Sequence, residues 1–258
     1  MMYMAKQSII HCETLGSGPN LVLLHGWAMH GGVWQGVRDQ LAVRYRVHLF
    51  DLPGHGLSPV YEPGDFNHIV EIINENLPDD CIVCGWSLGG QIAMQLAINN
   101  PGRVKKLVLV ATTPCFVQQR DWPWGMEHRF LQLFLENLHQ NYKMTINRFL
   151  TLQSNGEQHS THVLTQLRAY FFKRERPDYA VLQKGLVILQ TNDMRSKLHD
   201  IKLPVLLLHG EHDVITHPSA AQWMARQLKN ARLVMFPHCG HAPFLSNPEQ
   251  FIVCINAF

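Results

Sequence analysis

The sequence predicts an α/β fold in which a mostly parallel, doubly wound sheet carries an inserted helical cap. Near-continuous apolar runs at residues 107–111, 203–208 and 231–236 are typical of strands buried on both faces of a parallel sheet. Segments with helical spacing separate the strand-like runs, as βαβ units require. From residue 116 to residue 190 only helical patterns occur, which indicates an insertion. The expected division is a core formed by residues 1–115 and 191–258, and a cap formed by residues 116–190.

The first half of the chain supplies the early part of the sheet. Residues 8–12 and 21–24 are short apolar runs separated by a Gly-Ser-Gly-Pro turn at 16–19, and this pattern predicts a hairpin. Beyond the hairpin, strands and helices are expected to alternate. The expected elements are a helix at 33–43, a strand at 47–50 and a helix at 66–77.

The stretch around Ser87 has the pattern of a nucleophile elbow. Residues 81–84 form a short, apolar, partly β-branched run, and residues 91–99 have helical spacing. Gly85-x-Ser87-x-Gly89 lies between them, so a sharp turn would lift the serine hydroxyl above the sheet. Such a short pattern also arises by chance, and the alternative is a tight turn whose serine caps the following helix. The strand before the motif and the helix after it favour the nucleophile.

The cap is predicted to be helical and basic. It contains nine Lys and Arg residues against six Asp and Glu, whereas the rest of the chain contains 13 against 14. The excess of positive charge therefore lies on the cap. A solvated helical face is the commoner explanation of such an excess, and a docking patch is the alternative. The expected helices lie at 130–138, 146–152, 163–172 and 179–189.

The bulk composition disfavours several classes of protein. A formal net charge of +2 over 258 residues does not suggest a nucleic-acid-binding protein. The six cysteines lack the spacing of a disulfide framework, and Cys81 and Cys84 lie within a predicted strand, where a redox pair is not expected. The 16 histidines form no H-E-x-x-H pattern, so we expect no metal. Without a signal peptide or an apolar run of 18 residues, a cytoplasmic location and no membrane span are expected.

A serine hydroxyl becomes a strong nucleophile only when a base accepts its proton, and a carboxylate usually orients that base. The predicted strand at 203–208 ends in a loop that carries Asp213, the best candidate for the acid, and Glu211, the reserve. In a triad on a parallel sheet the acid follows a strand that comes after the nucleophile. The alternative role for Asp213 is to cap the helix that begins near Pro218.

The predicted strand at 231–236 ends in a loop with two histidines. His241 follows Gly240 deeper in the loop and is the better candidate for the base, whereas His238 is expected at the surface or behind the site. The alternative for His241 is a buried histidine with a purely structural hydrogen bond. That alternative does not explain why Ser87, Asp213 and His241 each follow a strand in the order that a triad requires.

The oxyanion of the reaction needs two N–H donors. One donor should be the backbone N–H of the residue after the nucleophile, Leu88, and the other should come from the loop after an early strand. His25-Gly26-Trp27 is that loop, so the Trp27 N–H is the second candidate. The Trp27 indole would then line the acyl pocket. The alternative is that the indole is simply part of the hydrophobic core.

Together these motifs resemble the α/β-hydrolase superfamily over nearly the full length of the chain. Within it, the chain is most similar to the carboxylesterases of biotin synthesis that demethylate pimeloyl-acyl-carrier-protein methyl ester. The superfamily motifs are His25-Gly26-Trp27, Asp51-Leu52-Pro53-Gly54-His55-Gly56-Leu57-Ser58, Gly85-Trp86-Ser87-Leu88-Gly89-Gly90, His209-Gly210-Glu211-His212-Asp213 and Gly240-His241-Ala242-Pro243. The segments that carry the closer similarity are residues 21–27, 113–116, 148–153 and 241–244.

The resemblance implies a catalytic triad of Ser87, Asp213 and His241 and no cofactor. It implies hydrolysis of the methyl ester of pimeloyl-acyl-carrier protein, with side activity on short acyl esters. In the family, basic cap residues meet the acidic carrier protein, and the candidates here are Arg148 first, then Lys143 and Arg168. The implied substrate contacts are Trp27, Ser87, Leu88, Phe149, Leu150, Thr151, Leu152, Gln153 and His241.

Several rival functions share the fold. A broad-specificity carboxylesterase, a thioesterase or a carbon–carbon bond hydrolase would use the same triad, and only a substrate panel separates them. Dehalogenases and epoxide hydrolases require a carboxylate where Ser87 stands. A non-catalytic ligand receptor would have a broken triad or oxyanion loop, and this sequence has neither. The expected partners are the acyl-carrier protein and small acyl esters, without nucleic acid or membrane, and we expect a monomer.

Overall fold

The computed structural model describes residues 10–60, 64–157 and 159–258. In this part of the chain a seven-stranded sheet has the order β1-β3-β2-β4-β5-β6-β7. Only β1 runs antiparallel to its neighbour, so the carboxyl ends of the other strands meet at one edge. The strands are β1 (Cys12–Leu15), β2 (Asn20–Leu24), β3 (Arg46–Phe50), β4 (Cys81–Trp86), β5 (Val104–Val110), β6 (Val205–Gly210) and β7 (Ala231–Phe236).

The predicted hairpin between the first two strands is wrong. β1 pairs with β3, so that Cys12 lies opposite Phe50, and β2 pairs in parallel with β3 and β4. The physical reason is burial: Leu21 to Leu24 are completely buried, which suits the middle of the sheet, whereas β1 is only half-buried and suits an edge. Residues 8 and 9 of the predicted first strand lie outside the described residues.

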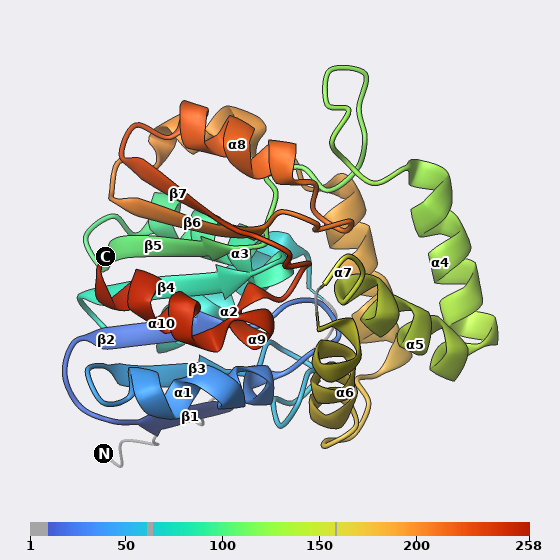
Figure 1. Cartoon of the computed structure of the whole chain (residues 1–258), viewed down its shortest axis with the longest axis horizontal. Helices are drawn as coiled ribbons and strands as arrows, with labels where there is room; N and C mark the ends of the chain where they lie inside the picture. The colour runs from blue at the N-terminus through green and yellow to red at the C-terminus, as the bar shows by residue number, and fades with distance from the viewer. Residues whose placement is uncertain (1–9, 61–63, 158) are drawn as a thin grey trace, which may run out of the picture.

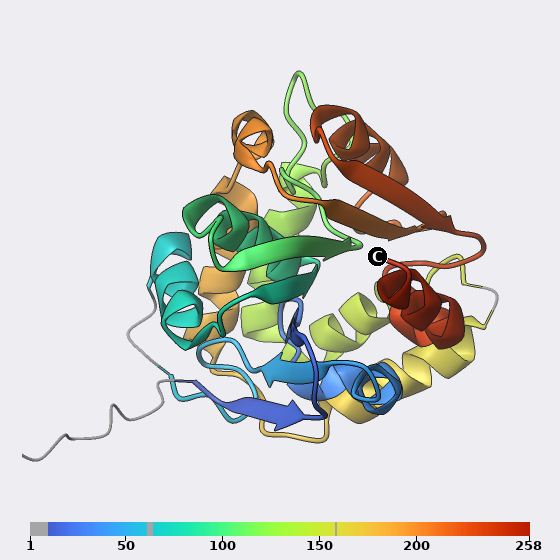
Figure 2. The ribbon, with the colours of Figure 1, turned by 90° about the vertical axis from the view of Figure 1, so that its left-hand side faces the viewer.

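Helices cover both faces of the sheet, as Figures 1 and 2 show. On one face α1, α9 and α10 pack together, and on the other α2 packs on α3, which lies along β4 and β5. The core helices are α1 (Gln35–Leu41), α2 (Phe66–Asn76), α3 (Leu88–Asn99), α8 (Pro218–Gln227), α9 (Pro243–Ser246) and α10 (Pro248–Asn256), with the 3₁₀ helices η1 (Gly31–Trp34) and η2 (Arg195–Asp200). In the described ranges, no helix is long and apolar enough to cross a membrane.

The chain between β5 and β6 forms a helical layer over the carboxyl edge of the sheet (Figure 1). This layer contains α4 (His128–Gln140), α5 (Tyr142–Gln153), α6 (Ser160–Phe171) and α7 (Tyr179–Thr191). Residues 116–127 are not helical but form a loop with bridges between Val117 and Met126 and between Gln119 and Trp122. We keep the name cap for residues 116–190, and the limits of the cap as a separate domain stay a prediction.

An aromatic cluster joins the sheet to the last two helices. The rings of Trp34 and Phe244 lie 4.3 Å apart, and Phe251 and Trp86 complete the cluster. Trp86 is the last residue of β4, and its indole Nε1 donates a hydrogen bond of 2.8 Å to the carbonyl oxygen of His241. The cluster therefore fixes the loop before α9 against the end of β4.

The turn from β4 into α3 requires a close approach of backbone to backbone at Gly85. A Cβ atom at this position would lie 2.2 Å from the carbonyl oxygen of Gly89 and 2.7 Å from the Cα atom of Gly90. Real Cβ atoms do not come so close, so the turn would have to open to accept any side chain. By contrast, a Cβ atom at the exposed Gly102 would meet no atom within 4 Å.

We expect Gly85→Ala to lower the free energy of unfolding by about 1–3 kcal/mol, because the added methyl group overpacks the turn. Gly102→Ala, the matched control, should change the free energy by less than about 1 kcal/mol. Urea unfolding followed by circular dichroism measures both. Equal stabilities of the two variants would contradict the close packing described for this turn.

Candidate active site

Ser87 occupies a strained turn between β4 and α3. Its backbone angles are φ 55° and ψ −117°, a conformation that non-glycine residues rarely adopt. Hydrogen bonds hold the turn: the Ser87 N–H donates to the carbonyl of Val110 at 3.0 Å, and the Ser87 carbonyl accepts from Thr112 Oγ1 at 2.7 Å. The Ser87 side chain makes no capping bond to α3, so the alternative of a serine that only caps the helix is wrong.

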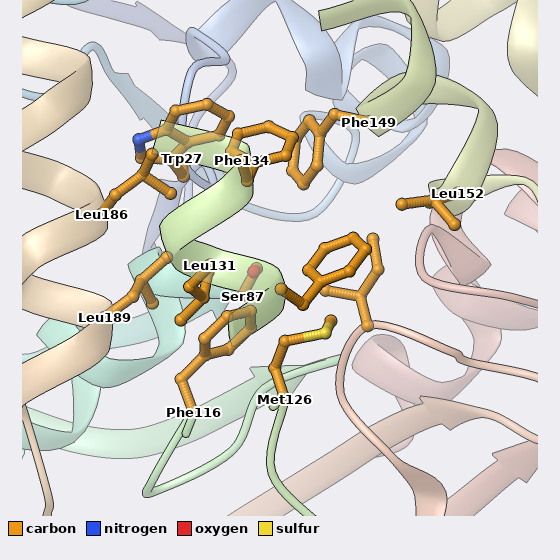
Figure 3. A pocket seen from close by; sticks show the side chains of 12 residues that line it. Trp27, Ser87, Phe116, Met126, Leu131, Phe134, Phe149, Leu152, Leu186 and Leu189 are labelled. Atoms are coloured by element: carbon orange, nitrogen blue, oxygen red, sulfur yellow. The ribbon is translucent and has the colours of Figure 1, made fainter. Parts of the chain in front are cut away.

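The Ser87 side chain faces an apolar cavity between the sheet edge and the cap. Figure 3 shows its hydroxyl among hydrocarbon and aromatic side chains, with Trp27, Phe134 and Phe149 grouped on one side. Ser87 is the only polar residue of the lining in the described part of the chain. The apolar residues that line the cavity are Trp27, Phe116, Met126, Phe130, Leu131, Phe134, Phe149, Leu152, Leu186, Leu189 and Ile215.

The structure brings Asp213 and His241 into direct contact. His241 Nδ1 lies 2.8 Å from Asp213 Oδ2, and both side chains are almost completely buried. An ionised carboxylate can only accept, so Nδ1 carries the proton and Nε2 is left as the basic nitrogen. The competing residues lie elsewhere: His238 and Glu211 are both exposed. The predicted pairing of acid and base therefore exists in the fold.

Asp213 is held as a carboxylate by several donors. Its Oδ1 accepts from the N–H groups of Ile215 and Thr216 at 2.8 and 2.9 Å, and its Oδ2 accepts from Thr216 Oγ1 at 2.7 Å. Burial alone would raise the pKa of Asp213, but the charge and hydrogen bond of His241, with His209 and Thr216, outweigh burial and lower the pKa. The N-cap of α8 is His217, so Asp213 does not have the alternative capping role.

Trp86 connects the pair to the serine. It precedes Ser87 in the chain, and its indole both donates to the His241 carbonyl and packs on the His241 ring, with ring centroids 5.5 Å apart. Neither Ser87 Oγ nor His241 Nε2 forms a hydrogen bond within the described residues. Catalytic hydrogen bonds of this kind are often long in the absence of substrate.

Two backbone N–H groups beside Ser87 are available as oxyanion donors. In the described ranges, neither the Trp27 N–H nor the Leu88 N–H is engaged by another hydrogen bond. Leu88 begins α3, whose N-terminus favours negative charge. The loop that carries Trp27 packs against Ser87, since a Cβ atom on Gly26 would lie 3.2 Å from Ser87 Cβ.

His25 orients the first of these donors. The Leu52 N–H donates to His25 Nε2 at 2.9 Å, so the ring proton lies on Nδ1, which donates to the Gly26 carbonyl at 2.8 Å. In a trans peptide the carbonyl of Gly26 and the N–H of Trp27 point in opposite directions. By holding the carbonyl, His25 turns the Trp27 N–H the other way. Burial lowers the pKa of His25 to about 3, so the ring stays neutral.

The cap residues expected to contact substrate have different surroundings. Phe149 and Leu152 line the cavity, Thr151 lies in a groove between α4 and α5, and Leu150 is buried in the hydrophobic core. The Gln153 side chain is also buried, and its amide oxygen and nitrogen have no hydrogen-bond partner in the described structure. Because buried polar groups are normally hydrogen-bonded, we expect this amide to bind a polar ligand or a water molecule.

The groove between α4 and α5 adjoins the cavity, because both are lined by Phe130, Phe134 and Leu152. Of the three basic residues expected at a docking surface, Arg148 lines this groove. Lys143 and Arg168 are exposed on α5 and α6 but do not line it. Arg148 is therefore the one of these three residues that lies at the groove.

Several cavity residues could not be singled out from the sequence. Phe116 and Met126 come from the loop before α4, Leu186 and Leu189 from α7, and Ile215 from the loop after β6. Each is an ordinary apolar residue whose spacing matches a core position, so no local signal separates lining from core. In the described ranges, no group of three or more His, Cys, Asp or Glu side chains could hold a metal ion.

Comparisons with known proteins agree with the observed fold and identify related enzymes. A family model described as the alpha/beta hydrolase fold matches residues 19–248. The pimeloyl-acyl-carrier-protein methyl ester esterase of Nitrosomonas europaea is 55% identical over 248 residues, which cover 96% of this chain and 98% of that protein. The protein of the same name from Nitrosospira multiformis is 49% identical over 259 residues, 98% of each chain. An esterase structure from Exiguobacterium antarcticum is similar in fold, with a TM-score of 0.89 at 24% identity over 96% of this chain and 94% of that one.

The buried histidine behind the oxyanion loop gives a testable pH dependence. Burial lowers the pKa of His55 to about 4 from the ordinary value of 6.5. Between these two pH values the unfolded chain binds a proton at His55 that the folded protein does not. The folded state therefore loses stability as the pH falls through this interval, by about 1.4 kcal/mol per pH unit for one such group.

Between pH 6.5 and 4, we expect His55→Phe to reduce the pH dependence of the free energy of unfolding by about 1.4 kcal/mol per pH unit. At pH 8 the variant should lose only about 1 kcal/mol of stability, for the missing hydrogen bond to the Pro53 carbonyl. The measurement is urea unfolding at a series of pH values. His199→Asn, a change at a side chain that is 73% exposed, is the matched control and should keep the wild-type slope. An unchanged slope in His55→Phe would show that this ring is protonated in the folded protein.

Proposed function

The chain belongs to the α/β-hydrolase family and, within it, to the pimeloyl-acyl-carrier-protein methyl ester esterases, and from this premise we propose how its residues carry out the reaction. The enzyme is a carboxylesterase that hydrolyses the methyl ester of pimeloyl-acyl-carrier protein and releases methanol. The observation that carries the proposed mechanism is the buried Asp213–His241 pair beside the strained Ser87, which faces an apolar cavity.

Ser87 is the proposed nucleophile. His241 Nε2 takes the proton of Ser87 Oγ as this oxygen attacks the ester carbonyl, and the carboxylate of Asp213 stabilises the imidazolium that forms. The negative charge of the tetrahedral intermediate falls on the former carbonyl oxygen. The N–H groups of Trp27 and Leu88 would hold that oxygen, and one such donor is typically worth ~10²–10³ in rate.

The remaining steps use the same residues, with His241 first giving up its proton and then accepting one again. The His241 imidazolium gives its proton to the departing methoxy oxygen, so methanol leaves and the acyl group stays on Ser87. A water molecule then loses a proton to His241 Nε2 and attacks the acyl-enzyme carbonyl. When this second intermediate collapses, the proton returns to Ser87 and the free carboxylic acid is released.

The cavity supports an acyl chain as substrate. A pimeloyl chain is hydrocarbon between its two carbonyl ends, and the cavity is apolar except at Ser87. Hydrocarbon removed from water contributes about 0.8 kcal/mol for each buried CH₂ group, so the lining can supply binding energy without polar contacts. The methyl ester is the end remote from the carrier, which suits a reacting group at the inner end of the cavity.

The groove between α4 and α5 is the proposed approach for the carrier-bound end of the substrate. It shares three lining residues with the cavity and has Arg148 on its wall. An acidic carrier protein would be attracted to this charge, which matches the positive excess of the cap. Lys143 and Arg168 are secondary candidates for the same contact.

The rival hydrolases of this fold differ in the bond that they cleave. The substrate itself offers two candidates, because the pimeloyl chain carries a methyl ester at one end and a thioester to the carrier at the other. An esterase produces methanol and leaves the thioester intact, whereas a thioesterase releases free monomethyl pimelate. Mass spectrometry of the carrier protein after reaction distinguishes the two.

We expect Ser87→Ala to reduce the hydrolysis of a short-chain p-nitrophenyl ester to near background, because no other described side chain in the cavity can attack the ester. Asp213→Asn should lower kcat by about 10⁴-fold, since the neutral amide favours the wrong tautomer of His241. Glu211→Gln removes the neighbouring exposed acid and is the matched control, with kcat close to wild type. Wild-type kcat in Ser87→Ala would refute the serine esterase mechanism.

The docking proposal predicts an effect that depends on the carrier. Arg148→Glu should raise KM for methyl pimeloyl-acyl-carrier protein about tenfold by reversing a charge at the interface, and leave the hydrolysis of free dimethyl pimelate unchanged. Arg232→Glu, an exposed charge reversal in β7 away from the cap, is the control and should change neither. Equal KM values for the carrier substrate in all three proteins would exclude Arg148 from docking.

The cellular role proposed for this activity is a step of biotin synthesis in the cytoplasm. The cysteines agree with a reducing compartment, because all six are free thiols in the structure. Expression of the gene in a bacterial strain that lacks its own demethylating esterase should restore growth without biotin. The Ser87→Ala variant should fail to do so at the same expression level.

A further inference from the structure

A segment of the cap is hydrogen-bonded to the loop that carries His241. The His241 N–H donates to the Gln153 carbonyl at 3.0 Å, and the Gly240 N–H donates to Glu157 Oε1 at 2.8 Å. The Ser246 hydroxyl donates to the same carboxylate oxygen at 2.6 Å. The end of α5 and the residues after it are therefore attached to both the catalytic histidine loop and the start of α9.

The same cap segment also contacts the loop that carries Asp213. His212 Nδ1 donates to the Gly156 carbonyl at 2.6 Å, because a carbonyl can only accept. Gly156 has a φ of +76°, and a Cβ atom there would lie 2.6 Å from His212 Cβ. The backbone of the cap thus lies directly on the residue before Asp213, and one short segment joins the loops of the acid and the base.

A glutamate at position 157 is unusual, because it is buried between the cap and the His241 loop. It is only 9% exposed, and among the described residues it forms no ion pair with Lys or Arg. The pKa of Glu157 is raised from its ordinary value, first by burial and then by the charge of Asp213, although the bonds from Ser246 and Gly240 act in the opposite direction. A buried carboxylate held by two neutral donors costs more than an amide that could accept the same two bonds. The ionisable carboxyl group, in place of a neutral amide, is therefore the property that requires an explanation.

We propose that Glu157 is a positioning residue for the esterase reaction, which anchors the His241 loop to the cap and places a second negative charge beside the Asp213–His241 pair. This inference rests on the proposed function. When Ser87 gives up its proton, His241 becomes positive and balances Asp213. The carboxylate of Glu157 then stabilises the positive ring at the moment it forms, whereas in the resting enzyme the charge of Asp213 opposes it. The other titratable groups around Glu157 are His159 and Cys239.

The test uses purified full-length Glu157→Gln, Glu157→Ala and Ser246→Ala, with a short-chain p-nitrophenyl ester as substrate. Glu157→Gln keeps an oxygen that can accept from Gly240 and Ser246 but removes the charge. We expect its KM to stay within about twofold of wild type and its kcat to fall about three- to tenfold. Because a negative charge near the site has been removed, the acid limb of kcat/KM should also move to lower pH.

Glu157→Ala removes both the charge and the anchor, so its kcat should fall further, about 10- to 100-fold. Ser246→Ala is the matched control, because it removes one donor but leaves the charge and the bond from Gly240. Its acid limb should coincide with that of the wild-type enzyme. Labelling of Ser87 by a fluorophosphonate probe gives the fraction of assembled sites, to which each kcat is normalised.

The outcomes are separable. Wild-type kcat and an unmoved acid limb in Glu157→Gln would overturn the inference, as would a higher KM at unchanged kcat, which would make Glu157 a substrate contact. If Glu157→Ala does not fold, Glu157→Gln decides alone. Ser87→Ala is assayed in parallel: if it remains active, the proposed function fails, whereas an inactive Ser87→Ala with normal Glu157 variants refutes only the role of Glu157.

Discussion

The hydrogen bond between the buried carboxylate of Asp213 and His241 is the contact on which the rest of the site depends. Removal of one partner from such a buried pair typically costs 3–5 kcal/mol, because the remaining charge is left without compensation. The sheet brings the two loops together: β6 and β7 are in parallel register, with Gly210 beside Phe236 at their ends. Gly210 permits this approach, since a Cβ atom there would lie 2.0 Å from the carbonyl oxygen of Gly240.

Backbone geometry supplies the remaining requirements of the site. Ser87 is held at a positive φ by hydrogen bonds to neighbouring strands and loops, so the strain of the turn is balanced by the packed sheet around it. His25 fixes one peptide of the oxyanion loop, and the start of α3 supplies the second N–H at Leu88. In the proposed mechanism these donors are in place before substrate binds, so little reorganisation is required as negative charge develops.

The cap contacts the core at several catalytic loops. Trp27 Nε1 donates to the Leu182 carbonyl at 2.9 Å, and the buried Asp51 at the end of β3 pairs with Arg174. Asp51 precedes Leu52, whose N–H holds His25 in its tautomer. With the bonds from Gln153 and Glu157 to the histidine loop, the cap supports both the proposed oxyanion donors and the proposed base. In the proposed mechanism it is therefore part of the active site in addition to covering it.

Local patterns in the sequence predicted most of the fold. The apolar runs at 203–208 and 231–236 and the helical spacing after Ser87 correspond to β6, β7 and α3, because these patterns depend on the local backbone. The burial expected for 231–236 is wrong, because β7 lies at the edge of the sheet and is only half-buried. The pairing of β1 with β3 could not be predicted, because a turn at 16–19 is compatible with either neighbour. That choice depends on which strand can be buried on both faces, and this is a property of the whole sheet.

The sequence by itself determined the candidate nucleophile, acid and base, because Ser87, Asp213 and His241 each follow a strand, and parallel strands end at one edge. Only the tertiary structure decided which apolar residues line the cavity, which tautomer His25 adopts, and that Glu157 reaches the histidine loop. These contacts join segments that are far apart along the chain. Their side chains follow no local period, so their meeting depends on how the cap packs against the edge of the sheet.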